Sequence, residues 1–203
     1  MPKIIALAHQ KGGVGKSTLS INLAHAFKEH KPTALVDMDM QGSVRDMAGK
    51  LEGIQLLPYS STLRKGDVGY IFIDTPPYLS GRLPEAFLQA DLVLIPTKAG
   101  VLDFLACGRT VEMVKQAMLK NKNLKAGIVL NMVSRSVQLT EDAQKYLEGY
   151  GIPVLKARIG DRSDFVRSVV YPDGIYSKEL NKSSGKAQEE LNSLVTEVLF
   201  MIQ

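Results

Sequence analysis

The stretch AHQKGGVGKSTLS, residues 8–20, lies between a short apolar run and the start of an amphipathic segment. It ends in the letters GKSTLS, as a phosphate-binding loop does, but Gln10 stands where the usual G-x-x-x-x-G-K-[ST] pattern has its first glycine. A strand before the loop and a helix after it are the context that this motif requires. The stretch therefore predicts a phosphate site, and it raises the question of what a second lysine, Lys11, contacts.

Each part of the loop has a chemical reason to bind a nucleotide. Glycines let successive backbone N–H groups point at one anion, and the dipole of the following helix adds to the attraction. Lys16 would reach the β- and γ-phosphates, the Ser17 hydroxyl would ligate Mg²⁺, and Thr18 would hydrogen-bond the α-phosphate. The nucleotide-binding residues predicted in the loop are Gly12, Gly13, Val14, Gly15, Lys16, Ser17 and Thr18. A dinucleotide fingerprint fits less well, because its third glycine position holds Thr18, and a glycine-rich turn without a ligand is the other alternative.

Short β-branched and apolar runs alternate with longer helical patterns along the chain. Strands are expected at residues 4–8, 33–36, 70–73, 92–96, 126–131 and 153–155. Helices are expected at residues 16–30, 84–89, 102–120, 140–150, 164–170 and 185–202. Residues 41–69 are less regular and accommodate a helix and a short strand at 54–57. Because such apolar strands are typical of sheets covered on both faces, we predict an α/β fold with a doubly wound, mainly parallel sheet flanked by helices.

Length and composition limit the classes of protein to which this chain can belong. The chain has 203 residues, which suits one P-loop domain over residues 1–203, and its 45% hydrophobic and 23% charged residues are ordinary for a soluble globular protein. One cysteine, Cys107, excludes an internal disulfide and a cysteine-rich metal site, and it fits a reducing cytoplasm. We see no secretory signal and no apolar run of about 20 residues that would span a membrane. The net charge of +4 permits contact with nucleic acid without requiring it.

Two acidic segments follow predicted strands. In YIFIDTPP, residues 70–77, Asp74 ends an apolar strand in the pattern of a Walker B segment, whose aspartate holds Mg²⁺ through a water. In ALVDMDMQG, residues 34–42, Asp37 and Asp39 end another strand, where residues two apart share a face. One of this pair can help hold the metal shell while the other orients or deprotonates a water. Each acid alone could be a turn residue or a helix cap, but three such segments in order favour one site.

The segments KGGVGKST, VDMDMQG and IDTPP, in this order, resemble the deviant Walker A ATPases of the ParA/MinD type. The resemblance extends over VLIPTKAGVLDFLACGRTVEMV and GIVLNMV, and so over most of the chain. It implies that ATP and Mg²⁺ bring two subunits face to face, with Lys11 reaching across to the partner's phosphates as an arginine finger does elsewhere. It also implies that Asp39 activates the water, that Asp37 lies near Mg²⁺ and that Asn131 contacts the adenine. The predicted catalytic residues are Lys11, Lys16 and Asp39, and the predicted metal-binding residues are Ser17, Asp37 and Asp74.

The chain departs from the family pattern at two positions. The family often has threonine where this chain has Ser17, and both residues supply a hydroxyl. The family usually has Asp-Pro-Gln where this chain reads Asp39-Met40-Gln41. We expect the missing proline to loosen this switch loop without removing its chemistry.

Among members of the family, the length favours a small ParA-type protein that segregates plasmid or chromosomal DNA. Such a protein would bind non-specific DNA as a dimer on the nucleoid, and a ParB-like centromere-binding partner would stimulate its slow ATP hydrolysis. The candidate DNA-binding residues are Arg158, Arg162, Arg167 and Lys186. Neutralising phosphates with such residues makes binding sensitive to salt.

Other readings remain open at this point. A MinD-like membrane ATPase needs cations on a C-terminal amphipathic helix, but residues 188–203, QEELNSLVTEVLFMIQ, have none, so a helix docked on the sheet is the better account and no membrane is expected. An electron-transfer iron protein needs paired cysteines, which one Cys107 cannot supply. A pure binding module is disfavoured because the hydrolytic residues are retained together. An ATPase that positions another cargo uses the same nucleotide switch and cannot be separated from a partition protein by these residues.

Overall fold

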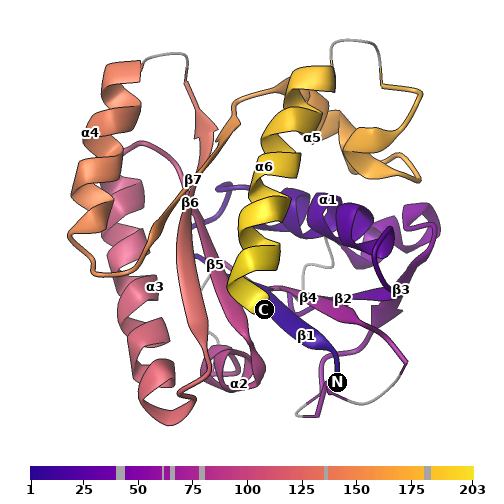
Figure 1. The fold of residues 1–203 in the computed structure, drawn as a ribbon, viewed down its shortest axis with the longest axis horizontal. Coiled ribbons are helices and arrows are strands. Elements are labelled where there is room, and N and C mark those ends of the chain that lie inside the picture. The colour runs from indigo at the N-terminus through magenta and orange to yellow at the C-terminus, as the bar shows by residue number, and fades with distance from the viewer. Residues whose placement is uncertain (40–43, 61, 65–66, 78–80, 135–136, 181–183) are drawn as a thin grey trace.

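The computed structural model describes the chain except residues 40–43, 61, 65–66, 78–80, 135–136 and 181–183 (Figure 1). Met40 and Gln41, where the missing proline was expected to act, lie outside the described residues. The strands are β1 (Lys3–Leu7), β2 (Thr33–Asp37), β3 (Ile54–Leu57), β4 (Tyr70–Asp74), β5 (Leu92–Thr97), β6 (Lys125–Val133) and β7 (Val154–Gly160). They form one seven-stranded sheet in the order β3-β2-β4-β1-β5-β6-β7, and each pair of neighbouring strands is parallel. The predicted fold class is confirmed, including the short strand at 54–57.

Helices alternate with the strands along the chain (Figure 1). They are α1 (Lys16–Lys28), α2 (Leu83–Gln89), α3 (Val101–Lys120), α4 (Val137–Glu148), α5 (Ser163–Ser168) and α6 (Gly185–Ile202), with short 3₁₀ helices η1 (Arg45–Lys50) and η2 (Gly174–Tyr176). The predicted helices are all present within a few residues at each end. The largest difference is α4, which begins three residues before the predicted position and ends two residues earlier.

The sheet separates two apolar cores because successive strand side chains point to opposite faces. In β1, Ile5 and Leu7 belong to the core under α1, α5 and α6, whereas Ile4 and Ala6 belong to the core under α2, α3 and α4. All four side chains are fully buried. Burial on both faces explains why the strand sequences are nearly continuous apolar runs.

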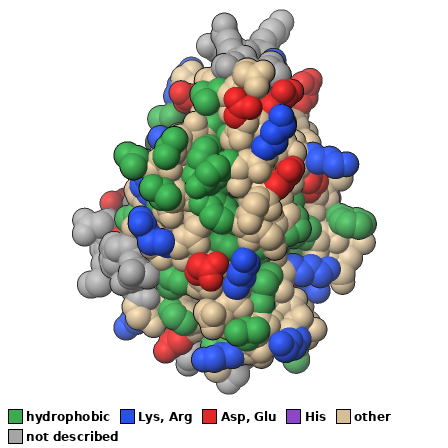
Figure 2. All heavy atoms as spheres, turned by 90° about the vertical axis from the view of Figure 1, so that its left-hand side faces the viewer, with side chains coloured by type: hydrophobic (Ala, Val, Ile, Leu, Met, Phe, Trp, Pro, Cys, Tyr) green, Lys and Arg blue, Asp and Glu red, His purple; other side chains and the backbone are tan. Residues whose placement is uncertain are grey.

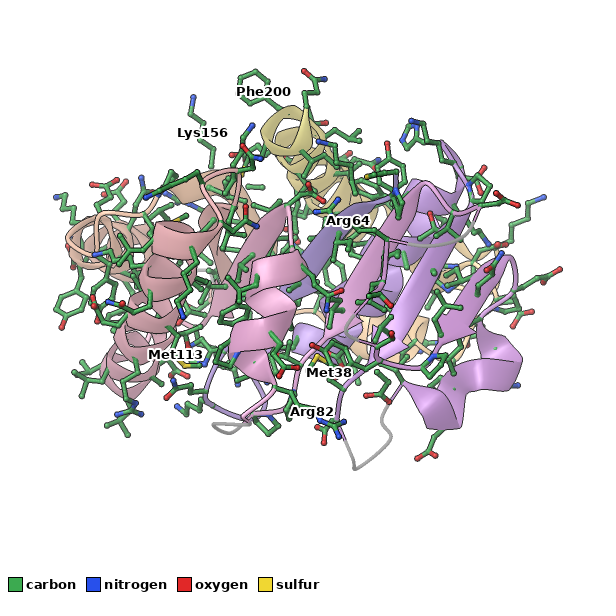
Figure 3. The ribbon with its side chains drawn as sticks, turned by 90° about the horizontal axis from the view of Figure 1, so that it is seen from below. Met38, Arg64, Arg82, Met113, Lys156 and Phe200 are labelled. Atoms are coloured by element: carbon green, nitrogen blue, oxygen red, sulfur yellow. The ribbon has the colours of Figure 1, made fainter. Side chains whose placement is uncertain are left out.

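The last helix, α6, docks on the sheet as predicted. Leu191, Leu194 and Val198 are fully buried against the core, whereas Phe200 is 76% exposed and points away from the molecule (Figure 3). None of the described helices has the length and apolar character that crossing a bilayer would need.

Strand order decides where the acidic segments meet the glycine-rich loop. The chain winds first to one side of β1 and later to the other, so β1 lies at the switch point of the sheet, between β4 and β5. In the parallel register, Leu7 and Asp37 are both paired with Asp74. The carboxyl ends of β1, β2 and β4 therefore meet at one edge, where ligands bind in open α/β sheets.

Candidate functional site

The loop after β1 has the backbone geometry of an anion cradle. Gly13 and Gly15 have φ angles of 70° and 88°, in the left-handed region that favours glycine. Gly15 caps α1, and its carbonyl accepts the first helical hydrogen bond, from the Leu19 N–H at 2.9 Å. A Cβ at Gly15 would also collide with the side-chain amide of Asn131. The loop thus presents the N-terminus of a 13-residue helix, whose dipole favours a bound anion.

Lys16 places a buried positive charge at the centre of this cradle. Its side chain is only 6% exposed, and its Nζ donates to the carbonyl oxygen of Lys11 at 3.3 Å. Burial lowers the pKa of Lys16, while the charges of Asp74 and Asp39 act in the opposite direction. A phosphate would supply the negative charge that stabilises this buried ammonium group.

Asp74 is the buried carboxylate of the site. It is fully buried, its Oδ1 accepts a hydrogen bond from Ser20 Oγ at 3.4 Å, and its Oδ2 has no partner among the described residues. Burial raises the pKa of Asp74 to about 7, whereas a hydrogen bond from Ser17 and the charge of Lys16 act to lower it. An oxygen ligand without a partner, next to the Ser17 hydroxyl, fits the donor set that Mg²⁺ prefers. When bound, Mg²⁺ would neutralise charge on the β- and γ-phosphates.

Asp37 and Asp39 have different local roles. Asp37 Oδ1 accepts the backbone N–H of Asp39 at 2.9 Å, and its Oδ2 accepts that of Val44 at 3.1 Å, so this carboxylate ties the end of β2 to the backbone of both residues. Asp39 is half-buried and close enough to Lys16 and Asp74 to influence the pKa of each. The position of Asp39 suits a group that orients a water. The role of Asp37 near Mg²⁺ stays a prediction.

Lys11 does not point into its own phosphate cradle. Its Nζ pairs with Asp103 Oδ1 at 2.8 Å, and the two side chains are 41% and 10% exposed. Asp103 lies in the first turn of α3, between the exposed Leu102 and the buried Phe104. Asp103 is not among the site residues predicted from the sequence, although it lies within the stretch VLIPTKAGVLDFLACGRTVEMV that carries part of the family resemblance. No spacing rule joins two residues 92 positions apart, so only the fold reveals this pair.

Two more residues attach the loop to its surroundings. The Nδ1 of buried His9 accepts the Lys11 N–H at 3.0 Å, and the Gln10 N–H donates to Thr110 Oγ1 at 3.2 Å. Gln10 also places its side-chain Nε2 3.0 Å from Met113 Sδ on α3. The glutamine at the usual glycine position therefore ties the loop to α3. A motif search could not have found these contacts, because they depend on where α3 lies.

Asn131 lies behind the loop, at the carboxyl end of β6. Its side chain is 3% exposed, and its amide donates to the carbonyl of Val14 at 2.7 Å. Asn131 and Thr18 line one side of a narrow groove, whose other lining residues are Leu19, Met132, Gly160, Asp161, Arg162, Phe165 and Val166. The groove shares Thr18 with the predicted nucleotide-binding residues. Adenine contact by Asn131 stays a prediction.

The four candidate DNA-binding residues do not form one free patch. Arg158 donates to Gln144 Oε1 at 2.8 Å, and Arg162 holds Glu190 through two contacts of 2.6 and 2.9 Å. Arg167, in the last turn of α5, and Lys186, in the first turn of α6, are exposed. Arg162 and Lys186 line the same hollow of about 520 Å³. Two of these side chains are thus already engaged within the subunit, and their role toward DNA stays a prediction.

Comparison with known proteins agrees with this arrangement. The sequence model of the CobQ/CobB/MinD/ParA nucleotide binding domain matches residues 5–172, which include the phosphate loop and both acidic strand ends. The chain is 29% identical over 208 residues to the "Maintenance of carboxysome distribution protein A" of Halothiobacillus neapolitanus, covering 96% of this chain and 95% of that protein. It is 28% identical over 203 residues to the chromosome partitioning protein ParA of Myxococcus xanthus, covering 73% and 71%. Among solved structures, the septum site-determining protein MinD of Pyrococcus horikoshii, complexed with Mg-ADP, has a TM-score of 0.70 at 23% identity and covers 98% of this chain and 96% of that one.

Proposed function

The chain belongs to the CobQ/CobB/MinD/ParA family of nucleotide-binding ATPases, and we propose that it is an Mg²⁺-dependent ATPase that switches between a monomer and an ATP-sandwich dimer. The observation that carries this proposal is the position of Lys11. Its ammonium group lies at the rim of the loop, partly exposed and held by Asp103 rather than by its own phosphate cradle. A lysine in this place is available to a second subunit, as the family resemblance predicts.

An apolar surface beside Lys11 supports a second copy as the partner. Val101 and Leu102 are each 71% exposed, and Leu105 on the next turn of α3 is 50% exposed. Figure 2 shows the face formed by α3 and α4, where hydrophobic side chains gather between separate charged groups. Because these residues adjoin the Lys11–Asp103 pair, a subunit that received Lys11 would also cover them. Covering this surface would contribute favourable apolar burial to the dimer.

The chemistry of the cycle follows from the site residues. Lys16 and the loop amides would hold the triphosphate, Ser17 and Asp74 would hold Mg²⁺, and Asp39 would orient the water that attacks the γ-phosphate. The site is complete only when each subunit inserts its Lys11 into the other. Hydrolysis is therefore slow in isolation, and a partner protein can accelerate it by fixing the geometry. The water attacks the γ-phosphorus as the bond to the β–γ bridging oxygen breaks, and release of the inorganic phosphate then removes the charge that attracts Lys11, so the dimer opens.

The trans role of Lys11 is tested with Lys11→Ala beside Lys120→Ala, an exposed lysine at the far end of α3. We expect Lys11→Ala to bind ATP normally but to remain monomeric and to lose turnover, while the control behaves as the wild type. Light scattering after gel filtration, with ATP and with a non-hydrolysable analogue, measures the dimer. Normal hydrolysis by Lys11→Ala would show that the lysine has no role in trans.

For the biological role, we propose that the dimer binds non-specific DNA on the nucleoid of the cytoplasm and moves plasmid or chromosomal DNA with a ParB-like partner. Exposed Arg167, together with exposed Lys186 in the hollow that also contains Arg162, supports a DNA surface. Binding to duplex DNA and to anionic vesicles is compared with ATP and with ADP over a salt series. ATP-dependent, salt-sensitive binding to DNA alone supports this role. Binding to vesicles alone would favour a MinD-like membrane function.

A second cargo class is favoured by one specific observation. The relative that matches 96% of this chain bears the name of a carboxysome distribution protein. The same DNA-bound switch would then position a protein body instead of a replicon. Deleting the gene in its host separates the two roles. Loss of a replicon supports partition, whereas clustering of a protein compartment with stable replicons supports cargo positioning.

A further inference from the structure

The histidine before the signature lysine has no part in the proposed chemistry, yet it is buried against the loop. His9 is 2% exposed, and its Nδ1 accepts the Lys11 N–H at 3.0 Å; its Nε2 forms no well-aligned hydrogen bond among the described residues, although the backbone of Asp103 lies close enough to raise the pKa of the ring. An Nδ1 that accepts a hydrogen bond carries no proton, so the neutral ring has its proton on Nε2. That N–H lies near the backbone of Asp103 without good hydrogen-bond geometry, so the Nδ1 contact with Lys11 is the well-formed hydrogen bond of the ring among the described residues.

Burial, together with the positive charges beside the ring, keeps His9 neutral. Burial lowers the pKa of His9 to about 4, and the positive charges of Lys16 and Lys11 act in the same direction, while Asp103 opposes them. A protonated ring could not accept the Lys11 N–H, and it would repel both ammonium groups. Near neutral pH the ring is thus a fixed hydrogen-bond acceptor.

The backbone of Lys11 is held from both sides as a result. Its N–H donates to His9 Nδ1, and its carbonyl accepts a hydrogen bond from Lys16 Nζ at 3.3 Å. These two hydrogen bonds hold the backbone of Lys11 but not its side chain, which forms a partly exposed ion pair with Asp103. We propose that His9 is a positioning residue for Lys11, holding its peptide in place so that the ammonium group reaches a second subunit by side-chain rotation alone. This inference rests on the proposed function, because it presupposes that Lys11 acts in trans.

The geometry provides matched substitutions. An asparagine carries its Oδ1 at the position of the histidine Nδ1, and asparagine side chains commonly accept the N–H two residues on. His9→Asn should therefore keep the contact, whereas His9→Leu fills similar space without an acceptor and should lose it. His9→Gln places its polar groups one bond further out and should resemble His9→Leu. His30→Gln, at an exposed histidine on the surface, is the control.

The first measurement is hydrogen exchange of the Lys11 amide in the nucleotide-free protein, which does not depend on dimer formation. We expect the amide to be protected in the wild type, His9→Asn and His30→Gln, and to exchange about three- to tenfold faster in His9→Leu and His9→Gln, as the loss of one neutral hydrogen bond predicts. Equal protection in His9→Leu would overturn the inference. Loss of protection in His9→Asn would also overturn it, because the acceptor would then not be the cause.

The second measurement separates positioning from a structural role. In His9→Leu we expect ATP affinity within about twofold of the wild type, but dimer affinity and turnover at saturating ATP lower by about three- to tenfold, with both restored in His9→Asn. A parallel loss of ATP affinity would show that the ring shapes the phosphate cradle instead, and would contradict the inference. A wild type that stays monomeric with ATP would contradict the proposed function, and His9 would then be judged by the amide exchange.

Discussion

Polar groups are paired to different degrees at the two ends of the parallel sheet. At the amino end, Arg64 donates to the carbonyls of Pro2 and Gln89 at 3.2 and 2.9 Å and pairs with Asp91 at 3.1 Å, while Asp91 accepts the Ile4 N–H at 2.8 Å. Figure 3, which views the molecule from below, shows Arg64 among these strand ends. At this end the polar contacts of Arg64 and Asp91 bind neighbouring elements to one another.

At the carboxyl end, the buried polar groups are left incomplete. Asp74 Oδ2 and His9 Nε2 form no well-aligned hydrogen bond among the described residues, and the buried ammonium group of Lys16 donates to a carbonyl oxygen rather than to a carboxylate. Unpaired buried groups reduce stability and persist where they serve a function. The comparison teaches that the amino end is completed by folding, whereas the carboxyl end is arranged to be completed by a ligand and a second subunit.

The largest effect is expected from Lys16→Ala, which removes the positive charge of the phosphate loop at the carboxyl end of the sheet. ATP turnover, measured as phosphate release, should fall by at least about a hundredfold, as with other groups that stabilise transition-state charge. The rise in unfolding temperature that Mg²⁺ and ATP give the wild type should also disappear, because bound ligand stabilises only the folded state. Lys120→Ala should retain both. Turnover within a few-fold of the wild type would show that Lys16 does not contact the phosphates.

His25 tests whether an unpaired buried group away from the site only reduces stability. It is 1% exposed on α1, and neither ring nitrogen has a partner among the described residues. Burial lowers its pKa to about 4, the charge of Lys28 acts in the same direction, and Asp173 opposes it. The unfolded chain therefore binds a proton between about pH 6.5 and pH 4 that the folded chain does not, so acid favours unfolding in this range.

This difference predicts that His25 contributes about 3 kcal/mol to the fall in unfolding free energy between pH 6.5 and pH 4. Urea unfolding across this range should show a smaller fall in His25→Met, while His30→Gln should keep the fall of the wild type. ATP turnover at pH 7.5 should be unchanged in His25→Met. An identical pH dependence in His25→Met and the wild type would mean that the ring titrates alike in both states.

The sequence alone predicted the fold and those site residues that lie within the glycine-rich loop or at the ends of strands. The apolar runs predicted the central strands, because strands buried on both faces consist largely of apolar residues. The strand at residues 54–57, at the edge of the sheet and only partly buried, was predicted less directly, within a segment of irregular pattern. The loop, Asp74 and the pair of acids after β2 lie at strand ends, where topology brings them together without any further information. Local motifs are enough for residues whose partners are backbone groups of the same loop.

The remainder depends on tertiary packing. Asp103, Thr110 and Met113 contact the loop from α3, about a hundred residues away, and no pattern in the sequence connects them. The ion pair between Arg162 and Glu190 was not predicted either, because the sequence does not show whether a basic side chain has an acidic neighbour in the fold. Long-range pairing of charges is set by how the helices dock, and periodicity describes only which face of a helix docks.

Arg64→Ala removes the side chain that pairs polar groups at the amino end of the sheet, and it should lower stability without affecting function. It leaves two carbonyls and Asp91 without their guanidinium partner, so the free energy of unfolding should fall by about 1–2 kcal/mol, given the partial exposure of the pair. ATP affinity and turnover should be unchanged. Arg64→Lys keeps the charge but not the planar set of donors, and it should recover only part of the loss. A change in ATP affinity would show that the two ends are coupled, and the comparison would fail.

The smallest effect is expected from a change at the Lys11–Asp103 ion pair, which lies beside the exposed apolar residues of α3. Asp103→Asn removes the charge that holds Lys11 within its own subunit, and a partly exposed ion pair contributes at most about 1 kcal/mol. Freed from this pair, Lys11 should join a second subunit more readily, so ATP-dependent dimer affinity should rise by up to about fivefold. The rise must vanish when Lys11→Ala is combined with Asp103→Asn, because only the lysine transmits it. Sedimentation velocity over a concentration series measures both variants, and a weaker dimer in Asp103→Asn would instead place this carboxylate among the groups that hold the two subunits together.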